Sequence, residues 1–315
     1  MAKMTKRVYG VVGIASYMAN WNADFTGRPK TIGDGTIFGS DKALKYSVKN
    51  FWDKQGEKVL YYKSYTIPEK ADGKIQPKDL TERYEEIFGE VVVDKNSSKD
   101  VLANLFSAID VMNFGATFAV KKQNIGLTGV VQVGQGMNKY EYTDVQVQDI
   151  LSPFRNSTKA DADASSLGKK IVSDEAHYVY PFSVNPNHYD GYMDLIDGFE
   201  GYTVEAYEKL REGLMKGATA LNTNSKSGAE NELALFVTCK EGTDLYLPQL
   251  DRYVNVYKNQ SNKIVYDFEE LSTFLQSVNS SIEQVELFYN PYKVVVENIG
   301  DSFEQKHLYT NETLV

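Results

Sequence analysis

Apolar positions near the start of the chain fall into continuous runs and one helical stripe. The run RVYGVVGIAS (7–16) predicts a strand, and a polar, glycine-containing loop follows it. A helix is expected over 41–53, because apolar residues recur there with helical spacing. These residues are Leu44, Val48, Phe51 and Trp52. The next run, KVLYYKSYTI (58–67), predicts a second strand.

Beyond residue 67 the pattern changes to an insertion and then returns to core elements. Residues 68–110 are polar and charged, with the short helical patterns LTERYEEIFGEV and KDVLANLFSAID. Residues 136–176 include the small, polar segment KADADASSLGKK (159–170), which predicts a mobile excursion. Strands are predicted at 114–120, 125–135, 177–184, 231–239, 253–257, 263–266, 284–289 and 293–297, and helices at 203–221 and 268–278.

The core elements follow the order strand, helix, strand, strand, helix, strand. This is the order of the split βαβ, or ferredoxin-like, arrangement, so the predicted class is α+β. Here a helical insertion and a hairpin insertion would interrupt it. RNA-recognition domains share this sheet, although their aromatic consensus strands are not found in this sequence.

Composition excludes several classes of protein. With 315 residues, 42% hydrophobic, the chain suits one large domain with insertions or two small ones. The single cysteine, Cys239, excludes an internal disulfide or a multi-cysteine metal site, and none of the three histidines has a metal-ligand partner at helical spacing. No stretch approaches the ~20 apolar residues of a membrane span. We therefore expect a cytoplasmic protein with no metal, cofactor or membrane partner.

Charge is distributed unevenly and points to the first fifth of the chain. Residues 1–60 hold ten Lys/Arg and five Asp/Glu, a net charge of +5, whereas the whole chain carries −9. The loop after the first strand adds amides, hydroxyls and glycines, which with cations are the groups that grip phosphates and sugars. Its candidate binding residues are Asn20, Asn22, Thr26, Arg28 and Lys30.

Further candidate cations lie on the helix and in two later loops. Lys42, Lys45 and Lys49 fall within roughly 60° of one another, away from the apolar stripe, so they can face a ligand or simply be solvated. Arg155 in SPFRNSTK and Lys226 in NTNSKSG lie in Ser/Asn-rich segments, where hydroxyls and amides can join a cation on a phosphate. Ordinary loop cations are an equally good interpretation of these two.

Asp24 has two interpretations. A carboxylate in such a loop can position a metal or act as a general base in RNA cleavage. It can equally accept hydrogen bonds from neighbouring loop amides in an Asx turn. No second carboxylate lies nearby in the sequence, which favours the turn, and no catalytic residue is predicted.

Several long motifs resemble the Cas-seven family of CRISPR-associated proteins. They run from about residue 7 to 250, and the branches of type I-B and I-C complexes are closest, with I-B favoured. The motifs are NADFTGRPK (22–30), FGSDK (38–42) with the lysine helix, NFGATFA (113–119), GVVQVGQGMNKYE (129–141), ILSPFRNSTK (150–159), KIVSDEAHYVYPF (170–182) and NTNSKSGAENELALF (222–236).

The resemblance implies a non-enzymatic backbone subunit of Cascade, the RNA-guided DNA surveillance complex. Identical subunits would polymerise along one CRISPR RNA in antiviral defence, next to a large subunit and Cas-five and Cas-six type proteins, and present the guide to target DNA. It also implies an RRM-like palm (1–67, 111–136 and 177–315), a finger (68–110) and a thumb hairpin (137–176). Guide-RNA contacts are implied for the candidate residues of the loop, the lysine helix and the two later loops. These are Asn20, Asn22, Thr26, Arg28, Lys30, Ser40, Lys42, Lys45, Lys49, Arg155 and Lys226.

Two other functions remain open from the sequence. One is a metal-dependent target-RNA endonuclease of the type III kind, which would use Asp24. The other is a free-standing RNA-binding protein. Where relatives of the I-E branch have an arginine and an acidic residue after the motif's asparagine, this chain has Ala23 and Phe25, so those contacts are in doubt.

Overall fold

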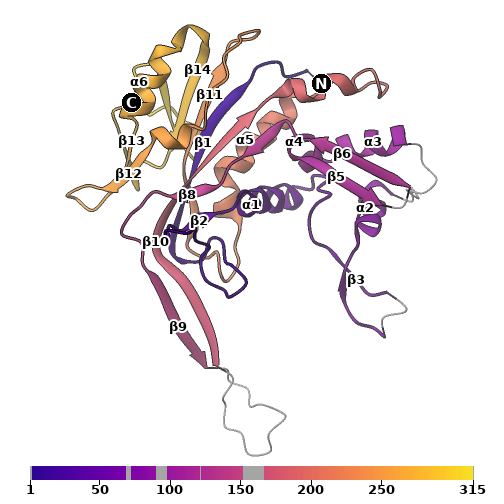
Figure 1. Ribbon diagram of the computed structural model, residues 1–315, viewed down its shortest axis with the longest axis horizontal. Coiled ribbons are helices and arrows are strands. Elements are labelled where there is room, and N and C mark those ends of the chain that lie inside the picture. Colours follow the sequence, from indigo (N-terminus) through magenta and orange to yellow (C-terminus); the bar gives the residue numbers. More distant parts are fainter. Residues whose placement is uncertain (1, 69–71, 90–97, 121, 152–166, 315) are drawn as a thin grey trace, which may run out of the picture.

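The computed structural model describes residues 2–68, 72–89, 98–120, 122–151 and 167–314 (Figure 1). Its largest element is a nine-stranded sheet with the order β16-β14-β11-β1-β10-β8-β2, while β7 and β9 each pair with β10. The strands are β1 (Val8–Ala19), β2 (Phe38–Gly39), β7 (Val131–Val133), β8 (Gly136–Asn138), β9 (Val145–Leu151), β10 (Leu167–Val184), β11 (Ala229–Cys239), β14 (Ile282–Tyr289) and β16 (Phe303–His307).

Smaller elements surround this sheet. A second sheet has the order β12-β13-β15, and β3-β4 and β5-β6 are hairpins. Their strands are β3 (Tyr65–Thr66), β4 (Gln76–Pro77), β5 (Gly115–Val120), β6 (Gln123–Thr128), β12 (Asn255–Lys258), β13 (Ile264–Asp267) and β15 (Val294–Glu297). The α-helices are α1 (Asp41–Lys54), α2 (Leu80–Phe88), α3 (Ser98–Ser107), α4 (Ile109–Phe114), α5 (Val204–Ala220) and α6 (Glu269–Ser277). The chain is thus a mixed α/β protein.

The central strand β1 is buried on both faces. Val8, Val12 and Ile14 belong to the core shared with α1 and α5, whereas Tyr9 and Val11 belong to the core under the C-terminal elements. This two-sided burial explains why the β1 sequence is apolar throughout rather than alternating. Both faces of the sheet are therefore covered, one by helices and the other by α6 and the second sheet (Figure 1).

A buried charged cluster joins the C-terminal elements to the large sheet. The His177 imidazole on β10 lies 2.7 Å from the Glu232 carboxylate on β11, and the Tyr266 hydroxyl on β13 donates to the same carboxylate at 2.6 Å. Glu175 contacts the other nitrogen of His177 at 3.2 Å and pairs with Lys258 on β12. Because the partners come from the four strands β10, β11, β12 and β13, the cluster fixes how β12 and β13 sit on the sheet.

Most predicted elements are confirmed. The first strand, the helices α1 and α5, the core part of β10, β11 and the paired C-terminal strands lie within a few residues of their expected positions. Thr203 is the N-cap of α5, and its hydroxyl accepts a hydrogen bond from the N–H of Ala206 at 3.1 Å. Cys239 is a buried strand residue, as expected.

The segment 58–67 is not a strand of the large sheet, so this expectation was wrong. Only Tyr65–Thr66 is extended there, and it pairs with Gln76–Pro77. Upstream, the N–H groups of Leu60 and Tyr61 both donate at 2.8 Å to the carboxylate of Asp110, which is fully buried. Because a side chain satisfies these backbone groups, the segment needs no neighbouring strand.

The region expected to supply palm strands, 111–136, is divided between two structures. Helix α4 extends to Phe114, and β5 then pairs with β6 in a separate hairpin. Only β7 and β8 reach the large sheet, through β10. Strand β16 was not anticipated, and it lies parallel to β14 at the sheet edge.

A long hairpin projects from the body of the molecule (Figure 1). Its arms are β9 and the first part of β10, paired from Leu151↔Leu167 to Val145↔Ser173. It lies within the range expected for a thumb. Residues 152–166, which include Arg155 and much of the segment 159–170, lie outside the described residues.

The charged cluster predicts a pH dependence of stability. Burial lowers the pKa of the His177 imidazole, but Glu232 and Glu175 outweigh it and raise the pKa to about 9. Since an unfolded histidine titrates near pH ~6.5, the cluster stabilises the fold fully below that pH and loses the contribution as pH rises towards 9. Between about pH 6.5 and 8 we expect the free energy of unfolding to fall by about 1–2 kcal/mol through this group.

The matched variant is His177→Gln/Glu232→Gln, which removes the imidazole together with its closest carboxylate and so leaves no unpaired carboxylate at position 232. Urea unfolding at several pH values should give a flatter profile for this variant than for the wild type. Parallel profiles of the two proteins below pH 8 would contradict a charged His177.

Candidate nucleic-acid interface

The loop between β1 and α1 folds into two consecutive tight excursions. Isolated bridges between Ala23 and Pro29 and between Thr31 and Ile37 close them. The backbone N–H of Lys30 donates to Asn22 at 2.9 Å, and that of Phe38 donates to Lys30 at 2.9 Å. The predicted glycine-and-amide loop is therefore an ordered structure held by its own backbone hydrogen bonds.

Asp24 organises the first excursion. One of its carboxylate oxygens accepts from the N–H of Thr26 at 2.8 Å, from the Thr26 hydroxyl at 2.7 Å and from the N–H of Arg28 at 3.0 Å. These bonds, led by that of the Thr26 hydroxyl, lower the pKa of Asp24. The Asx-turn interpretation of Asp24 is confirmed.

Asn22 and Asn20 connect the loop to the elements around it. The Asn22 side-chain oxygen accepts the N–H of Ser40 at 2.7 Å, which ties the loop to the residue preceding α1. The Asn20 amide donates to the carbonyl of Gly27 at 2.9 Å and to that of Ile171, in the projecting arm of β10, at 3.1 Å. Both side chains act on protein groups here and fix the loop relative to α1 and the hairpin.

Trp21 forms the floor beneath the loop. It is fully buried, and its indole N–H donates at 2.6 Å to the hydroxyl of Tyr180. Gly39 lies directly against both rings, since a side-chain carbon at this position would come within 2.7 Å of the Trp21 ring. A glycine is therefore required for β2 and the start of α1 to approach this floor.

Lys226 supports the loop from below. Its ammonium donates to the carbonyls of Asn20, at 2.7 Å, and of Trp21, and it lies 5.6 Å from the Trp21 ring centre. Burial lowers the pKa of this lysine to about 8. A contact of Lys226 with RNA stays a prediction, and the ammonium is already engaged with the carbonyls at the end of β1.

The three lysines of α1 differ in exposure along the helix. Lys42 is exposed, and Lys45 is half-buried and pairs with Asp41 at 3.1 Å. Lys49 lies 3.4 Å from the buried Asp110, and burial lowers its pKa although Asp110 opposes the shift. A contact between Lys49 and RNA, which stays a prediction, would require the ammonium to leave that carboxylate.

The exposed members of the predicted set gather on the loop and the adjacent start of α1. Thr26, Arg28 and Lys42 are exposed, and Lys30 is half-buried. Within the described ranges Arg28, Lys30 and Lys42 form no ion pair, although Arg28 lies in the field of Asp24. Their positive charge is therefore available to a polyanion.

A hollow beside the loop contains residues that the sequence analysis did not propose. It is lined by Ala23, Asp24, Phe25, Lys30, Thr31 and Phe38. Phe25 is fully exposed, with a relative exposure of 111%. An apolar residue between two polar ones in a turn carries no periodic signal, so only the presence of an aromatic residue in a polar loop could have drawn attention to it.

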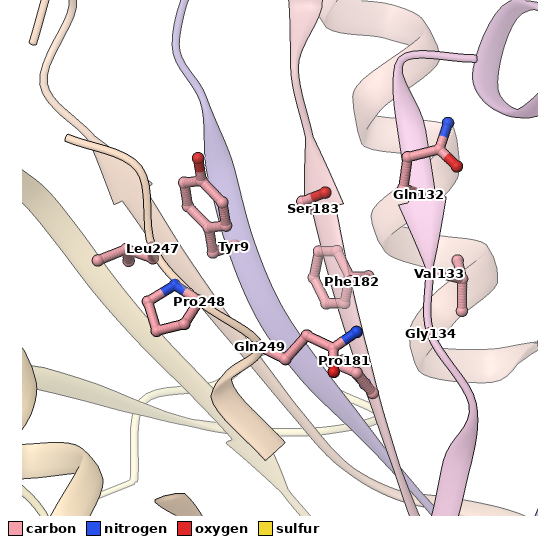
Figure 2. Close-up of a pocket in the computed structure, with 10 residues that line it drawn as sticks. All are labelled: Tyr9, Gln132, Val133, Gly134, Pro181, Phe182, Ser183, Leu247, Pro248 and Gln249. Atoms are coloured by element: carbon pink, nitrogen blue, oxygen red, sulfur yellow. The ribbon is translucent and has the colours of Figure 1, made fainter. Parts of the chain in front are cut away.

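A second hollow opens on the sheet itself (Figure 2). Tyr9 of β1, Pro181 of β10 and the segment 247–249 line it, and no charged side chain belongs to its lining. RNA-recognition domains bind RNA on an open sheet face with exposed aromatic residues. Here C-terminal elements cover much of that face, and the remaining opening lacks cations, so the loop is the better candidate.

Two further properties of the described residues bear on the kind of site. No group of three or more His, Cys, Asp or Glu side chains is arranged to hold a metal ion there. In the same part of the chain, no helix is both long and apolar enough to cross a bilayer. The arrangement can attract and position an anionic strand through cations, hydroxyls and a rigid backbone.

The fold and the loop define a mixed α/β protein with a large sheet, a projecting hairpin and a cationic loop beside it. The same fold occurs in a chain of a "CRISPR RNA-guided surveillance complex, pre-nicking", with a TM-score of 0.58 at 10% identity, covering 96% of this chain and 97% of that one. A "CRISPR RNA-guided surveillance complex" also contains a similar chain, with a TM-score of 0.48 at 12% identity over 92% and 93% of the two chains.

The sequence itself defines the family. Residues 6–275 match the family described as CRISPR-associated protein Cas7. No curated protein matches the chain significantly. This chain belongs to the Cas7 family.

The two kinds of lysine at this interface should respond differently to removal of the charge. Lys226→Met keeps the aliphatic stem but leaves the Asn20 and Trp21 carbonyls without their donor, so we expect it to lower the free energy of unfolding by about 1–3 kcal/mol. Lys42→Met, at an exposed position, should change it by less than about 0.5 kcal/mol. Urea unfolding of the RNA-free protein measures both. Equal stability of the two variants would show that Lys226 does not support the loop.

Proposed function

We propose that this Cas7-family protein is a backbone subunit of a type I CRISPR surveillance complex, Cascade. Copies of the chain polymerise along one CRISPR RNA, hold its ribose-phosphate backbone without reading its sequence, and present it for pairing with target DNA. The protein itself has no catalytic role in this proposal. The observation that carries it is the rigid loop after β1, with exposed Arg28 and Lys42 and half-buried Lys30, in a chain of this family.

The domain assignment follows the order of the strands. The palm consists of β1, β8, β10 and β11 with the helices α1 and α5, and the order β11-β1-β10-β8 is that of an RRM-like, ferredoxin-like sheet. The helical elements within 68–110 form the finger. The hairpin of β9 and β10 within 137–176 is the thumb, which reaches over the neighbouring copy of the chain.

The partners and the subtype extend the same proposal. The other partners are a large subunit and Cas-five and Cas-six type proteins, and the assembly works in the cytoplasm. The long motifs between residues 7 and 250 favour the I-B branch. Support for the guide RNA as ligand comes from the charge pattern, because the basic first 60 residues supply the exposed cations of the loop.

The mechanism depends on a grip that does not discriminate between bases. Contacts to phosphate and sugar position a strand but carry no sequence information, which suits a guide whose sequence varies. The loop is held by Asn20, Asn22 and Asp24 before RNA arrives, so little conformational entropy is lost on binding. A guide held in an extended, ordered form in turn pairs with its target at a lower entropic cost.

Salt dependence tests this grip. The triple variant Arg28→Gln/Lys30→Gln/Lys42→Gln should weaken binding to single-stranded RNA and reduce the slope of log K against log salt by about 2, because each phosphate contact contributes about 0.7. Fluorescence anisotropy between about 50 and 300 mM salt measures the slope. The substitutions avoid Lys49, whose loss would leave Asp110 buried without a cation.

The matched control is a second triple variant, Lys6→Gln/Lys99→Gln/Lys240→Gln. These three substitutions remove the same charge at positions away from the loop. Lys6 precedes β1 and Lys240 follows β11, both at the end of β1 opposite the loop, and Lys99 lies on α3. This control variant should keep the wild-type slope of log K against log salt, and it should still assemble on RNA. Equal losses in the two variants would mean that net charge, and not this loop, governs binding.

The cleavage alternative predicts a different outcome. If Asp24 served a metal-dependent endonuclease, assembled complex incubated with complementary RNA and Mg²⁺ would cut it, and Asp24→Asn would abolish the cut while the complex still formed. We expect no cleavage, because the turn takes up one oxygen of Asp24 and the described residues bring no further carboxylates or histidines together with it to hold a metal ion. A free-standing RNA-binding protein would instead remain monomeric on a long RNA, as measured by light scattering.

A further inference from the structure

Phe25 occupies an unusual position for an apolar residue. It lies at the tip of the first excursion with its side chain fully exposed, at 111% of the reference exposure. Exposed apolar side chains that are scattered over a surface need no explanation. Phe25, in contrast, lies on an ordered loop that also carries cations. An exposed aromatic ring beside cations suits a ligand that has an apolar part and an anionic part.

The tip is rigid although its side chain contacts little. On one side the N–H of Asp24 donates to the carbonyl of Arg28 at 2.7 Å, and on the other the Asn20 amide holds the carbonyl of Gly27 at 2.9 Å. Gly27 has a φ of 84°, a left-handed conformation that glycine adopts without strain. The backbone thus presents the Phe25 ring to solvent in a fixed place, and no packing of the ring itself is needed to keep the turn.

The hollow next to Phe25 has the chemistry of a nucleobase site. Its lining includes the aromatic residues Phe25 and Phe38 together with Lys30 and Thr31. Asp24 also lines it, and one oxygen of that carboxylate accepts the hydrogen bonds of the turn. A base offers a flat π-face for the rings, and its attached phosphate offers an anion for the nearby cations. Stacking on aromatic side chains is tolerant of base identity, as a varying guide requires.

We propose that Phe25, beside the hollow that Phe38 also lines, stacks on one unpaired base of the bound single-stranded RNA. The inference rests on the proposed function and adds a base contact to a grip otherwise made of backbone contacts.

A double-mutant cycle between protein and RNA tests the contact. The probe is a single-stranded RNA of about ten nucleotides, a typical site size, with one abasic position moved along it. For the wild-type protein we expect one abasic position to weaken binding by about 10-fold. In Phe25→Ala the affinity for intact RNA should fall by a similar factor, and the abasic penalty at that position should disappear.

Two matched variants accompany this test. Phe25→Tyr keeps a ring and should retain both the affinity and the abasic penalty. Tyr292→Ala removes another exposed aromatic residue, 83% exposed and in the turn before β15, and should change neither. Because the Phe25 side chain packs little, Phe25→Ala should also unfold at the wild-type urea concentration.

The other outcomes separate this inference from the proposed function. If Phe25→Ala binds intact RNA as the wild type does and keeps its abasic penalty, the stacking contact is refuted while the salt-dependent grip stands. If Phe25→Ala binds the short RNA normally but fails to assemble on long RNA, Phe25 contacts a neighbouring copy and the inference is wrong. If the wild type shows no salt-dependent RNA binding at all, the proposed function fails first.

Discussion

The burial of β1 on both faces is the constraint on which the rest of the structure depends. Its side chains alternate between a helical core and a C-terminal core, so little of either face of the central sheet remains open as a binding platform. A sheet covered in this way can use only its edges and the loops at its strand ends. The loop after β1, the adjacent hairpin arm of β10 and the start of α1 meet at one such end, and they share hydrogen bonds there.

Lysines near this loop serve two purposes that composition does not distinguish. Lys226 and Lys49 satisfy carbonyls or a carboxylate inside the protein, and burial lowers the pKa of both. Lys42 and Lys30 remain on the outside. A buried cation with protein partners stabilises the loop, whereas an exposed one attracts a polyanion over a distance of about a Debye length. The interior lysines therefore shape the surface on which the exterior ones act.

Sequence patterns predicted the fold wherever burial alone determines an element. The runs at β1 and β11 and the stripes of α1 and α5 are such elements. The strand expected at 58–67 failed because its N–H groups are satisfied by Asp110, a residue about 50 positions away along the chain. Likewise, the sequence located the loop and its cations. It could not show that Lys49 and Lys226 are engaged with protein groups, because their partners lie near them only in the folded chain.

A sequence-blind grip needs a rigid frame more than it needs many charges. An exposed cation on a mobile loop gains little from a phosphate, since ordering the loop costs about as much as the contact provides. Here Asn22 and Asp24, which the motif suggested as ligands, turn their side chains towards the protein backbone. The N–H groups of Thr26, Arg28 and Lys30 are also bonded within the loop, which leaves the side-chain cations of Arg28 and Lys30 as its outward-facing groups. In the proposed function, Asn22 and Asp24 contribute to binding chiefly by holding the loop, and the cations depend on them for their position.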